Sequence, residues 1–273
     1  MIPAKFDYER ADSVDAAVAL LQQHGDDAKL LAGGHSLLPL MKLRLAAPAV
    51  LVDIGRLGDL SYVREDGDRV AIGALTRHHD VANAPVLAEH CPIVAHTAGQ
   101  IGDPQVRHMG TIGGSVAHGD PASDMPTVLL ALDAEFTAKG PGGDRTIAAG
   151  EFFSGLFETA LNADEVLTEI RVPKTSAGWS YLKFHRRAQD WAMVGVAAVR
   201  MNGGVHVALT NMGDRPLRAS SVEQALESGA DPATAAASAA DGTAPPSDAF
   251  GSAEYRKELS KVLVRRALQE AMN

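Results

Sequence analysis

The sequence has 273 residues, enough for one large domain or for two to three small ones. Its formal net charge of -9 argues against a general binder of nucleic acid or anionic membranes, because no basic excess exists to meet phosphate groups. The single cysteine, Cys91, excludes an internal disulfide and a cysteine-based iron–sulfur site within the chain. Because the chain shows neither a signal-peptide pattern nor roughly 20 consecutive apolar residues, we expect a cytoplasmic protein without a transmembrane segment.

The first part of the chain predicts a small β-α-β unit. Ser13 precedes an apolar pattern of helical spacing over residues 14–24, and Gly25 follows as a stop signal. Short apolar runs at residues 29–32 and 49–54 predict two strands with a helix between them. A strand, a helix and a second strand in this order favour a parallel pair.

The middle of the chain mixes predicted helices and strands without an internal repeat. The spacing of apolar residues predicts helices at residues 76–81, 87–98 and 127–132. Alternation and turn residues predict strands at residues 69–74, 134–138, 145–147 and 165–173.

The last hundred residues predict three strands followed by helices. The strands are expected at residues 179–186, 194–201 and 205–211. Asn202-Gly203-Gly204 between the second and third strands is a strong hairpin signal. Helices are expected at residues 221–228, 231–240 and 253–271.

Two adjacent glycines mark the stretch Ala32-Gly33-Gly34-His35-Ser36-Leu37, between a predicted strand and a predicted helix. Glycines at such a junction let the backbone approach a ligand and expose its N–H groups. Ser36 is a candidate cap for the helix that follows, and bare N–H groups at a helix start attract anions. The stretch therefore predicts a phosphate or pyrophosphate site, with an ordinary glycine turn as the alternative.

A second glycine-rich stretch, Gly110-Thr111-Ile112-Gly113-Gly114-Ser115, lies further along the chain. Neither stretch matches the G-x-G-x-x-G pattern of dinucleotide-binding folds, and neither is followed by the Lys-Ser/Thr of a phosphate loop. We expect both turns to offer backbone N–H donors to one extended anionic ligand, for which a pyrophosphate is suited.

Three further features have two interpretations each. Asp124 is a candidate acceptor for ribose hydroxyls, or a helix cap before Met125. Trp191 stands in a polar neighbourhood and is either a stacking surface for a flat ring or a core aromatic. The pair His78-His79 suggests a metal, but adjacent side chains on one element diverge, so we expect no metal site.

The two glycine-rich stretches together resemble the FAD-binding medium subunit of molybdenum hydroxylases. The resemblance runs from Met1-Ile2-Pro3 to the C-terminal helix and is greatest to the carbon monoxide dehydrogenase type. It includes Asp103-Pro104-Gln105-Val106-Arg107, Gly119-Asp120-Pro121-Ala122-Ser123-Asp124 and Ala253-Glu254-Tyr255-Arg256.

The resemblance implies an α+β fold of the vanillyl-alcohol-oxidase type. An FAD-binding domain would span residues 1–175, with a small α/β subdomain at about 1–58 and a mixed α+β subdomain at 59–175. A C-terminal domain, residues 176–273, would place a three-stranded antiparallel sheet and helices over the flavin.

The resemblance also assigns roles to individual residues. Ile101 and Gly102 would lie near the adenine or ribityl side, and Asp124 would bind a ribose hydroxyl. Leu167 would contact the adenine or the flavin edge through its backbone. Lys183 would approach the pyrimidine end of the flavin or the ribityl chain. Trp191 would lie over the isoalloxazine, and Asp190 would lie near its reactive edge; neither is an acid or base catalyst. The pyrophosphate would be bound by Ala32, Gly33, Gly34, His35, Ser36, Leu37, Gly110, Thr111, Gly113, Gly114 and Ser115.

Two residues depart from the family's pattern. Ser115 stands where asparagine or aspartate is common, which predicts a weaker hydrogen bond there. Trp191 replaces a common tyrosine, so the aromatic face is retained and the hydroxyl is lost.

The function implied by the resemblance is electron transfer through FAD, from two [2Fe-2S] clusters on a small partner subunit to an external acceptor. A large molybdenum-cofactor subunit would oxidise the substrate, carbon monoxide in the type most similar to this chain. The complex would be a dimer of heterotrimers, in the cytoplasm or at the inner face of the membrane. A self-standing flavin reductase or oxidase of the same fold and a flavin-free assembly subunit are the alternatives.

Overall fold

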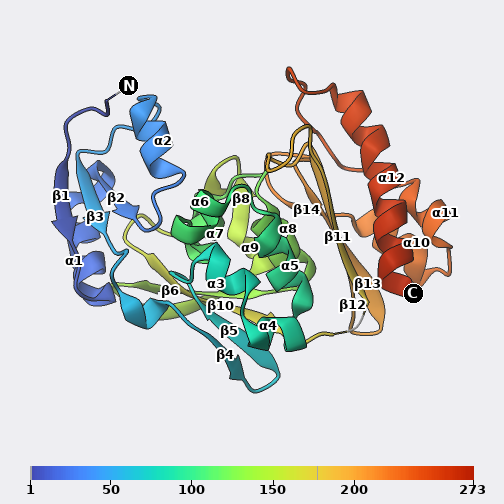
Figure 1. The fold of residues 1–273 in the computed structure, drawn as a ribbon, viewed down its shortest axis with the longest axis horizontal. Helices are drawn as coiled ribbons and strands as arrows, with labels where there is room; N and C mark the ends of the chain where they lie inside the picture. Colours follow the sequence, from blue (N-terminus) through green and yellow to red (C-terminus); the bar gives the residue numbers. More distant parts are fainter. Residues whose placement is uncertain (1, 177) are drawn as a thin grey trace.

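Three β-sheets of three or more strands follow one another along the described chain, and each is accompanied by helices of its own (Figure 1). The computed structural model describes residues 2–176 and 178–273. Met1 of the predicted N-terminal motif and Ala177 of the predicted domain boundary lie outside the described residues. Along the long axis of the molecule the three units lie in the order of the sequence, with the middle unit at the centre.

The N-terminal sheet is parallel, with the strand order β1-β3-β2. Helix α1 (Val14–His24) begins where Ser13 Oγ accepts the N–H of Ala16 at 3.0 Å, as the capping pattern predicted. The predicted parallel pair is confirmed, and a third strand that we did not predict lies beside it. The unit contains β1 (Asp7–Arg10), β2 (Ala28–Leu31), α2 (Leu37–Lys42) and β3 (Val50–Asp53).

The middle sheet is antiparallel, with the strand order β4-β5-β10-β6-β7. Its strands are β4 (Val63–Asp66), β5 (Arg69–Gly73), β6 (Glu135–Gly140), β7 (Gly143–Ala148) and β10 (Val166–Pro173). Most of its helices lie between β5 and β6: α3 (His78–Ala82), α4 (Pro85–His90), α5 (Pro92–Gln100), α6 (Pro104–Met109), α7 (Ile112–His118) and α8 (Asp124–Ala131). After β7 come α9 (Ala149–Phe152) and the small hairpin of β8 (Phe153–Gly155) and β9 (Glu158–Thr159).

The single helix predicted for residues 87–98 is wrong, because the structure has two helices there. Helix α4 ends at His90, and Pro92 begins α5. Proline has no N–H and disfavours helical backbone at the preceding residue, and Cys91 accordingly adopts φ -154° and ψ 63°. The Cys91 side chain is fully buried between the two helices.

The C-terminal sheet is antiparallel, with the strand order β11-β12-β13-β14. The three predicted strands are confirmed, and the two-residue strand β14 extends the sheet to four strands. The helix predicted over residues 231–240 is shorter and ends at Ala236. The elements are β11 (Trp179–Phe184), β12 (Val194–Met201), β13 (Gly204–Thr210), β14 (Leu217–Arg218), α10 (Ser220–Glu227), α11 (Pro232–Ala236) and α12 (Ala253–Met272).

Strand β12 joins two hydrophobic cores because both of its faces are buried. Val194, Val196 and Ala198 belong to the core beneath α10, α11 and α12. Ala197 and Val199 point the other way, into the core of the middle unit. The C-terminal sheet therefore packs between its own helices and the middle unit, as Figure 1 shows.

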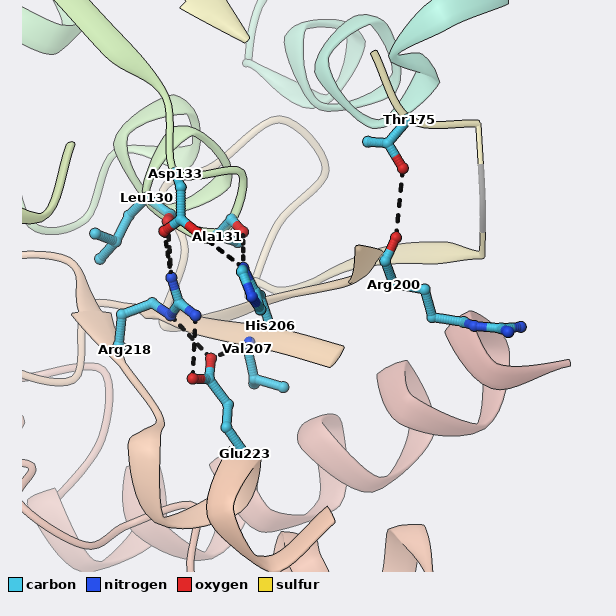
Figure 2. A network of polar contacts seen from close by, with 9 residues as sticks. All are labelled: Leu130, Ala131, Asp133, Thr175, Arg200, His206, Val207, Arg218 and Glu223. Carbon is cyan, nitrogen blue, oxygen red and sulfur yellow. Dashed lines mark hydrogen bonds and ion pairs between the residues drawn. The ribbon is translucent and has the colours of Figure 1, made fainter. Parts of the chain in front are cut away.

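Polar contacts reinforce this packing at the end of α8 (Figure 2). The Asp133 carboxylate accepts from Arg218 Nη1 at 2.6 Å and lies 3.2 Å from His206 Nδ1. Arg218 in turn donates to Glu223, and the Thr175 hydroxyl donates to the carbonyl of Arg200. The middle and C-terminal units are thus held together by charged groups as well as by apolar packing. The order of helices and sheets agrees with the predicted α+β fold.

Candidate functional site

A cavity of about 910 Å³ brings together all the residues predicted to bind FAD. Its lining comes from the N-terminal unit, the middle unit and the C-terminal unit. The predicted residues in the lining are Ala32, Gly33, Gly34, His35, Ser36, Leu37, Ile101, Gly102, Gly110, Thr111, Gly113, Gly114, Ser115, Asp124, Leu167, Lys183, Asp190 and Trp191.

The first turn, residues 33–36, lines this cavity. The N–H groups of Gly33, Gly34, His35 and Ser36 donate to no acceptor within the part of the chain that the structure describes. Gly34 has φ +74°, a conformation that side chains rarely adopt, and its carbonyl accepts the N–H of Leu38. The predicted cap is wrong, because the Ser36 side chain makes no capping bond to α2 among the described residues. The turn therefore keeps its donors available for a ligand.

The second turn, residues 110–115, uses its N–H groups differently. We expected these groups to face the ligand, but most of them donate to the protein because the turn is built into the middle unit. The donors, with their acceptors, are Gly110 to Val106 O, Ile112 to Thr76 O, Gly113 to Ala74 O, Gly114 to Thr111 Oγ1, and Ser115 to Thr111 O. Within this turn Gly114 is exposed to the cavity, the Thr111 hydroxyl accepts the N–H of Gly114, and the Ser115 hydroxyl bonds that of Ser123 at 2.8 Å.

The two turns touch each other through their backbones. A Cβ atom on Gly33 would lie 2.8 Å from Gly110 Cα and closer still to the Met109 carbonyl. His35 Nδ1 lies 3.1 Å from the Gly33 carbonyl, which places the imidazole over its own turn. Only glycine fits at position 33, so the contact fixes the first turn against the second.

A buried polar cluster links the C-terminal unit to α8 at the cavity wall. Asp124 accepts from Tyr181 Oη at 2.6 Å and from Lys183 Nζ at 2.8 Å, and the side chains of Asp124 and Lys183 are less than a tenth exposed. Burial raises the pKa of Asp124, while the neighbouring Lys183 ammonium opposes that increase. Ser123, not Asp124, occupies the cap position of α8, so the helix-cap interpretation is wrong.

Trp191 also lines the cavity, and 60% of its surface is exposed. The core interpretation of this residue is therefore wrong. Asp190 accepts from Arg187 Nε at 3.1 Å, which lowers the pKa of its carboxyl group. A Cβ atom on Gly102 would lie 2.7 Å from the Gln189 backbone, so Gly102 lies beside the loop that carries Trp191.

Leu167 and Ile101 line the cavity with apolar surface. Leu167 is 5% exposed and lies next to a bulge in β10, opposite Ala138 of β6. Ile101 follows α5, and its carbonyl accepts from Arg107 Nη1 at 2.5 Å. Both residues close the cavity between the middle unit and its neighbours.

Three groups in the lining escaped the sequence analysis. His78 is buried with its Nδ1 unpartnered among the described residues, and burial lowers its pKa to about 4. Glu165 is paired with Arg145 at 2.6 Å, and the ring of Phe157 packs on that of His118. Of these, only His78 carried a signal, in the pair that suggested a metal; no group of three or more His, Cys, Asp or Glu side chains within residues 2–176 and 178–273 forms a metal site.

The site suits a ligand that carries an anionic group and a flat ring. Within the described chain, N–H groups without acceptors lie at the first turn, and an exposed indole belongs to the lining. A buried imidazole nitrogen without a partner belongs to His78, whose ring lies next to Gly110. No helix of the described chain is long and apolar enough to cross a membrane.

Comparison with known proteins agrees with this geometry. The carbon monoxide dehydrogenase medium chain of Hydrogenophaga pseudoflava is 44% identical over 99% of this chain and 98% of its own. The glyceraldehyde dehydrogenase medium chain of Sulfolobus acidocaldarius is 40% identical over 99% of both chains.

Solved structures are similar over the whole chain. Carbon monoxide dehydrogenase from H. pseudoflava, in a form that lacks the Mo-pyranopterin moiety of the molybdenum cofactor, superposes with a TM-score of 0.95 at 44% identity, covering 100% of this chain and 99% of that one. Quinoline 2-oxidoreductase from Pseudomonas putida 86 gives 0.92 at 31% identity, covering 99% and 98%.

Two family models divide the chain between them. The CO dehydrogenase flavoprotein C-terminal domain matches residues 179–271. The FAD binding domain in molybdopterin dehydrogenase matches residues 4–175. The chain belongs to this family of FAD-binding proteins of the molybdopterin dehydrogenases, and FAD is its cofactor.

Proposed function

We propose that this chain is the FAD-carrying electron-transfer subunit of a molybdenum-containing dehydrogenase complex of the carbon monoxide dehydrogenase type. The observation that carries the proposal is the cavity in which both glycine-rich turns meet Lys183 and Trp191. The family match and the 44% identity to a carbon monoxide dehydrogenase medium chain support the same assignment.

The first turn would bind the pyrophosphate through the free N–H groups of residues 33–36. The second turn would hold the other side of the pyrophosphate with the Thr111 and Ser115 hydroxyls, over a surface that its glycines keep shallow. Asp124 retains acceptor capacity for a ribose hydroxyl, because a carboxylate has more lone pairs than its two present partners use.

At the flavin end, Trp191 would cover the isoalloxazine with its indole face. Lys183 would hold a positive charge near the pyrimidine side, fixed there by Asp124 and Tyr181. Bound FAD supplies the redox chemistry, exchanging single electrons on one side for two-electron delivery on the other. The chain contributes placement of the cofactor and the charges of Lys183 and Asp190, and it supplies no acid or base of its own.

The partners in this proposal are a large molybdenum-cofactor subunit and a small subunit with two [2Fe-2S] clusters, assembled as a dimer of heterotrimers in the cytoplasm. The single cysteine supports the division of labour, because [2Fe-2S] clusters need cysteine ligands that this chain does not have. We further propose that the domain boundaries lie near residues 58 and 175, between the sheets described above.

Sequence identity separates the possible substrates only slightly, because relatives named for different substrates are almost equally identical to this chain. The carbon monoxide dehydrogenase medium chain is 44% identical and the glyceraldehyde dehydrogenase medium chain is 40% identical. The proposal of carbon monoxide rests on this difference and on the family of the C-terminal domain.

Affinity purification of the full chain from its source cells tests the proposal. We expect a yellow complex that contains FAD, molybdenum, iron and two further subunits, and that reduces its flavin when carbon monoxide is added. Glyceraldehyde as an alternative substrate is the matched comparison. A colourless complex would support the flavin-free assembly subunit, and turnover by the chain alone would support a self-standing flavoenzyme; either result contradicts the proposal.

A further inference from the structure

Phe157 is an exposed aromatic residue held in an unusual backbone conformation at the cavity. It lies in the loop between β8 and β9, and 52% of its surface is exposed. Its φ is +57°, a left-handed conformation that costs a bulky residue free energy and that recurs at functional sites. Its ring packs on His118, with ring centroids 5.0 Å apart and an interplanar angle of 38°. Nothing in the FAD assignment above uses this pair.

Helix α7 connects the second turn to Phe157 along the cavity wall. Gly114, Ala117 and His118 stand at i, i+3 and i+4, so they share one face of the helix, and all three line the cavity. Gly114 and Ala117 are exposed and small, and the first large group along this face is the His118 ring. From Thr111 to His118 the distance along the axis is roughly 10 Å. A ligand that lies on this face therefore meets a flat ring only at the end with Phe157.

Charge distinguishes this end of the cavity from the turns. Asp120 and Glu158 line it with carboxylates, which disfavour a phosphate group. Burial lowers the pKa of His118, so its imidazole is neutral at neutral pH. An uncharged ring with an amino group suits these surroundings, because carboxylates accept hydrogen bonds.

Two exposed aromatic rings thus line the cavity. Trp191 follows Gln189, whose backbone lies against Gly102 just before α6, and Phe157 packs on His118 at the end of α7. Each is exposed and part of the lining, and the second glycine-rich turn joins α6 to α7 between these two contacts. This arrangement matches a ligand with a flat ring on each side of a pyrophosphate.

We infer that Phe157, supported by His118, is the stacking surface for the adenine ring of FAD, and thereby selects FAD over FMN. The inference rests on the proposed function, because it requires FAD in this cavity. It adds to that function a residue that separates binding of the adenine half from binding of the flavin half.

The test compares three ligands on the full chain, purified with any subunits that copurify and stripped of flavin. FAD contains both rings, ADP contains only the adenine half, and FMN contains only the flavin half. We expect Phe157→Ala to weaken FAD and ADP about tenfold, the size of one lost stacking contact, and to leave FMN unchanged. Trp191→Ala should weaken FAD and FMN while leaving ADP unchanged. Titration calorimetry and flavin fluorescence measure the affinities.

Leu156→Ala is the matched control, because Leu156 is the exposed neighbour of Phe157 and is not part of the lining. Leu156→Ala should bind all three ligands like the unmodified chain. Phe157→Trp, which keeps an aromatic ring at this position, should bind ADP as tightly as the unmodified chain does. If the unmodified chain binds FAD but Phe157→Ala leaves FAD and ADP unchanged, or lowers FMN equally, the inference fails alone. If the unmodified chain binds no FAD, the proposed function and the inference both fail.

Discussion

The two glycine-rich turns are similar in composition and differ in what their backbones do. The first turn, residues 33–36, leaves its N–H groups without acceptors in the described chain. The second turn, residues 110–115, donates most of its N–H groups to the protein and packs a glycine against Ala74. Similar glycine motifs thus serve two purposes: one exposes donors to a ligand, and the other lets a helix come close to a strand end. Substitutions at single glycines test this difference.

The largest effect is expected for Gly113→Ala, in the second turn. A Cβ atom at this position would lie 2.5 Å from both Ala74 Cβ and the Ala74 carbonyl, inside a fully buried contact. We expect the free energy of unfolding of the flavin-free protein to fall by about 3 kcal/mol, because neither neighbour can move independently of the backbone. Urea denaturation measures the change. Gly150→Ala in α9 is the control, because an added Cβ there would have no described atom within 4 Å apart from its own chain neighbours and helix backbone. Equal losses of stability in both variants would refute the packing role of Gly113.

Gly114→Val should separate binding from folding within the second turn. Gly114 faces the cavity, and the atom nearest to an added Cβ is Thr111 Oγ1 at 2.7 Å. We expect FAD affinity to fall at least about 100-fold, because valine would fill the space beside the pyrophosphate. The unfolding free energy should change by about 1 kcal/mol at most, the value of the disturbed Thr111 cap.

The control for Gly114→Val is the same substitution at Gly99, an exposed helical glycine outside the lining, around which the described chain leaves open space. FAD affinity should be unaffected there. Undiminished flavin content in Gly114→Val would show that the second turn does not border the ligand.

His78 makes the packing of the second turn sensitive to acid. The backbone N–H of His78 donates to the Gly110 carbonyl. Burial lowers the pKa of the His78 side chain to about 4, from 6.5 in the unfolded chain. The unfolded chain therefore binds the additional proton between these values, so stability is retained above pH 6.5 and falls as the pH decreases below it. Between pH 6.5 and 5 the loss should be about 2 kcal/mol. Urea denaturation at several pH values measures the free energy of unfolding. His78→Asn should abolish most of its decrease between pH 6.5 and 5. An unchanged pH dependence in this variant would show that His78 does not cause the loss.

The smallest effect is expected in the first turn, for Gly34→Ala. Position 34 has φ +74°, and the nearest atoms to an added Cβ belong to the flexible Leu31 and Leu38 side chains, so the main cost is backbone strain of about 1 kcal/mol. A small shift of the turn would misdirect its N–H groups, and we expect FAD affinity to fall about tenfold. Gly229→Ala, at φ +89° in open surroundings, should show the same strain with normal FAD binding. A loss of affinity in both variants would mean that stability, not the turn, controls binding.

The sequence was sufficient for features that depend on neighbouring residues. Helix α1 begins after Ser13 and ends before Gly25, as predicted. Asn202 and Gly203 form the turn of the predicted hairpin, with φ values of 52° and 79°. Strand β1 was missed because Asp7-Tyr8-Glu9-Arg10 is polar and mostly exposed, and only its pairing with β3 makes it a strand. Pro92 is itself a signal for the end of a helix, but the apolar spacing continues on both sides of it and predicted one helix in place of two.

The sequence itself indicated the two turns, Asp124 and Trp191, and the resemblance added Ile101, Gly102, Leu167, Lys183 and Asp190. The contacts of these residues depend on the fold. Whether an N–H group is free depends on an acceptor far away in sequence, as Thr76 is for Ile112. The same limit applies to Asp124 of α8, whose partners Tyr181 and Lys183 come from strand β11 of the C-terminal sheet. Phe157 carried no local signal, because neither its φ nor its contact with His118 follows from the residues around it.

The burial of Cys91 makes this chain convenient for site-directed spectroscopy. Burial raises the pKa of its thiol to about 12, so the nucleophilic thiolate is scarce at neutral pH and maleimide or spin-label reagents will spare it. A cysteine introduced at an exposed position such as Leu156 or Tyr255 would therefore be the only reactive thiol of the chain. Labels at both positions would report the distance between the middle and C-terminal units with and without FAD.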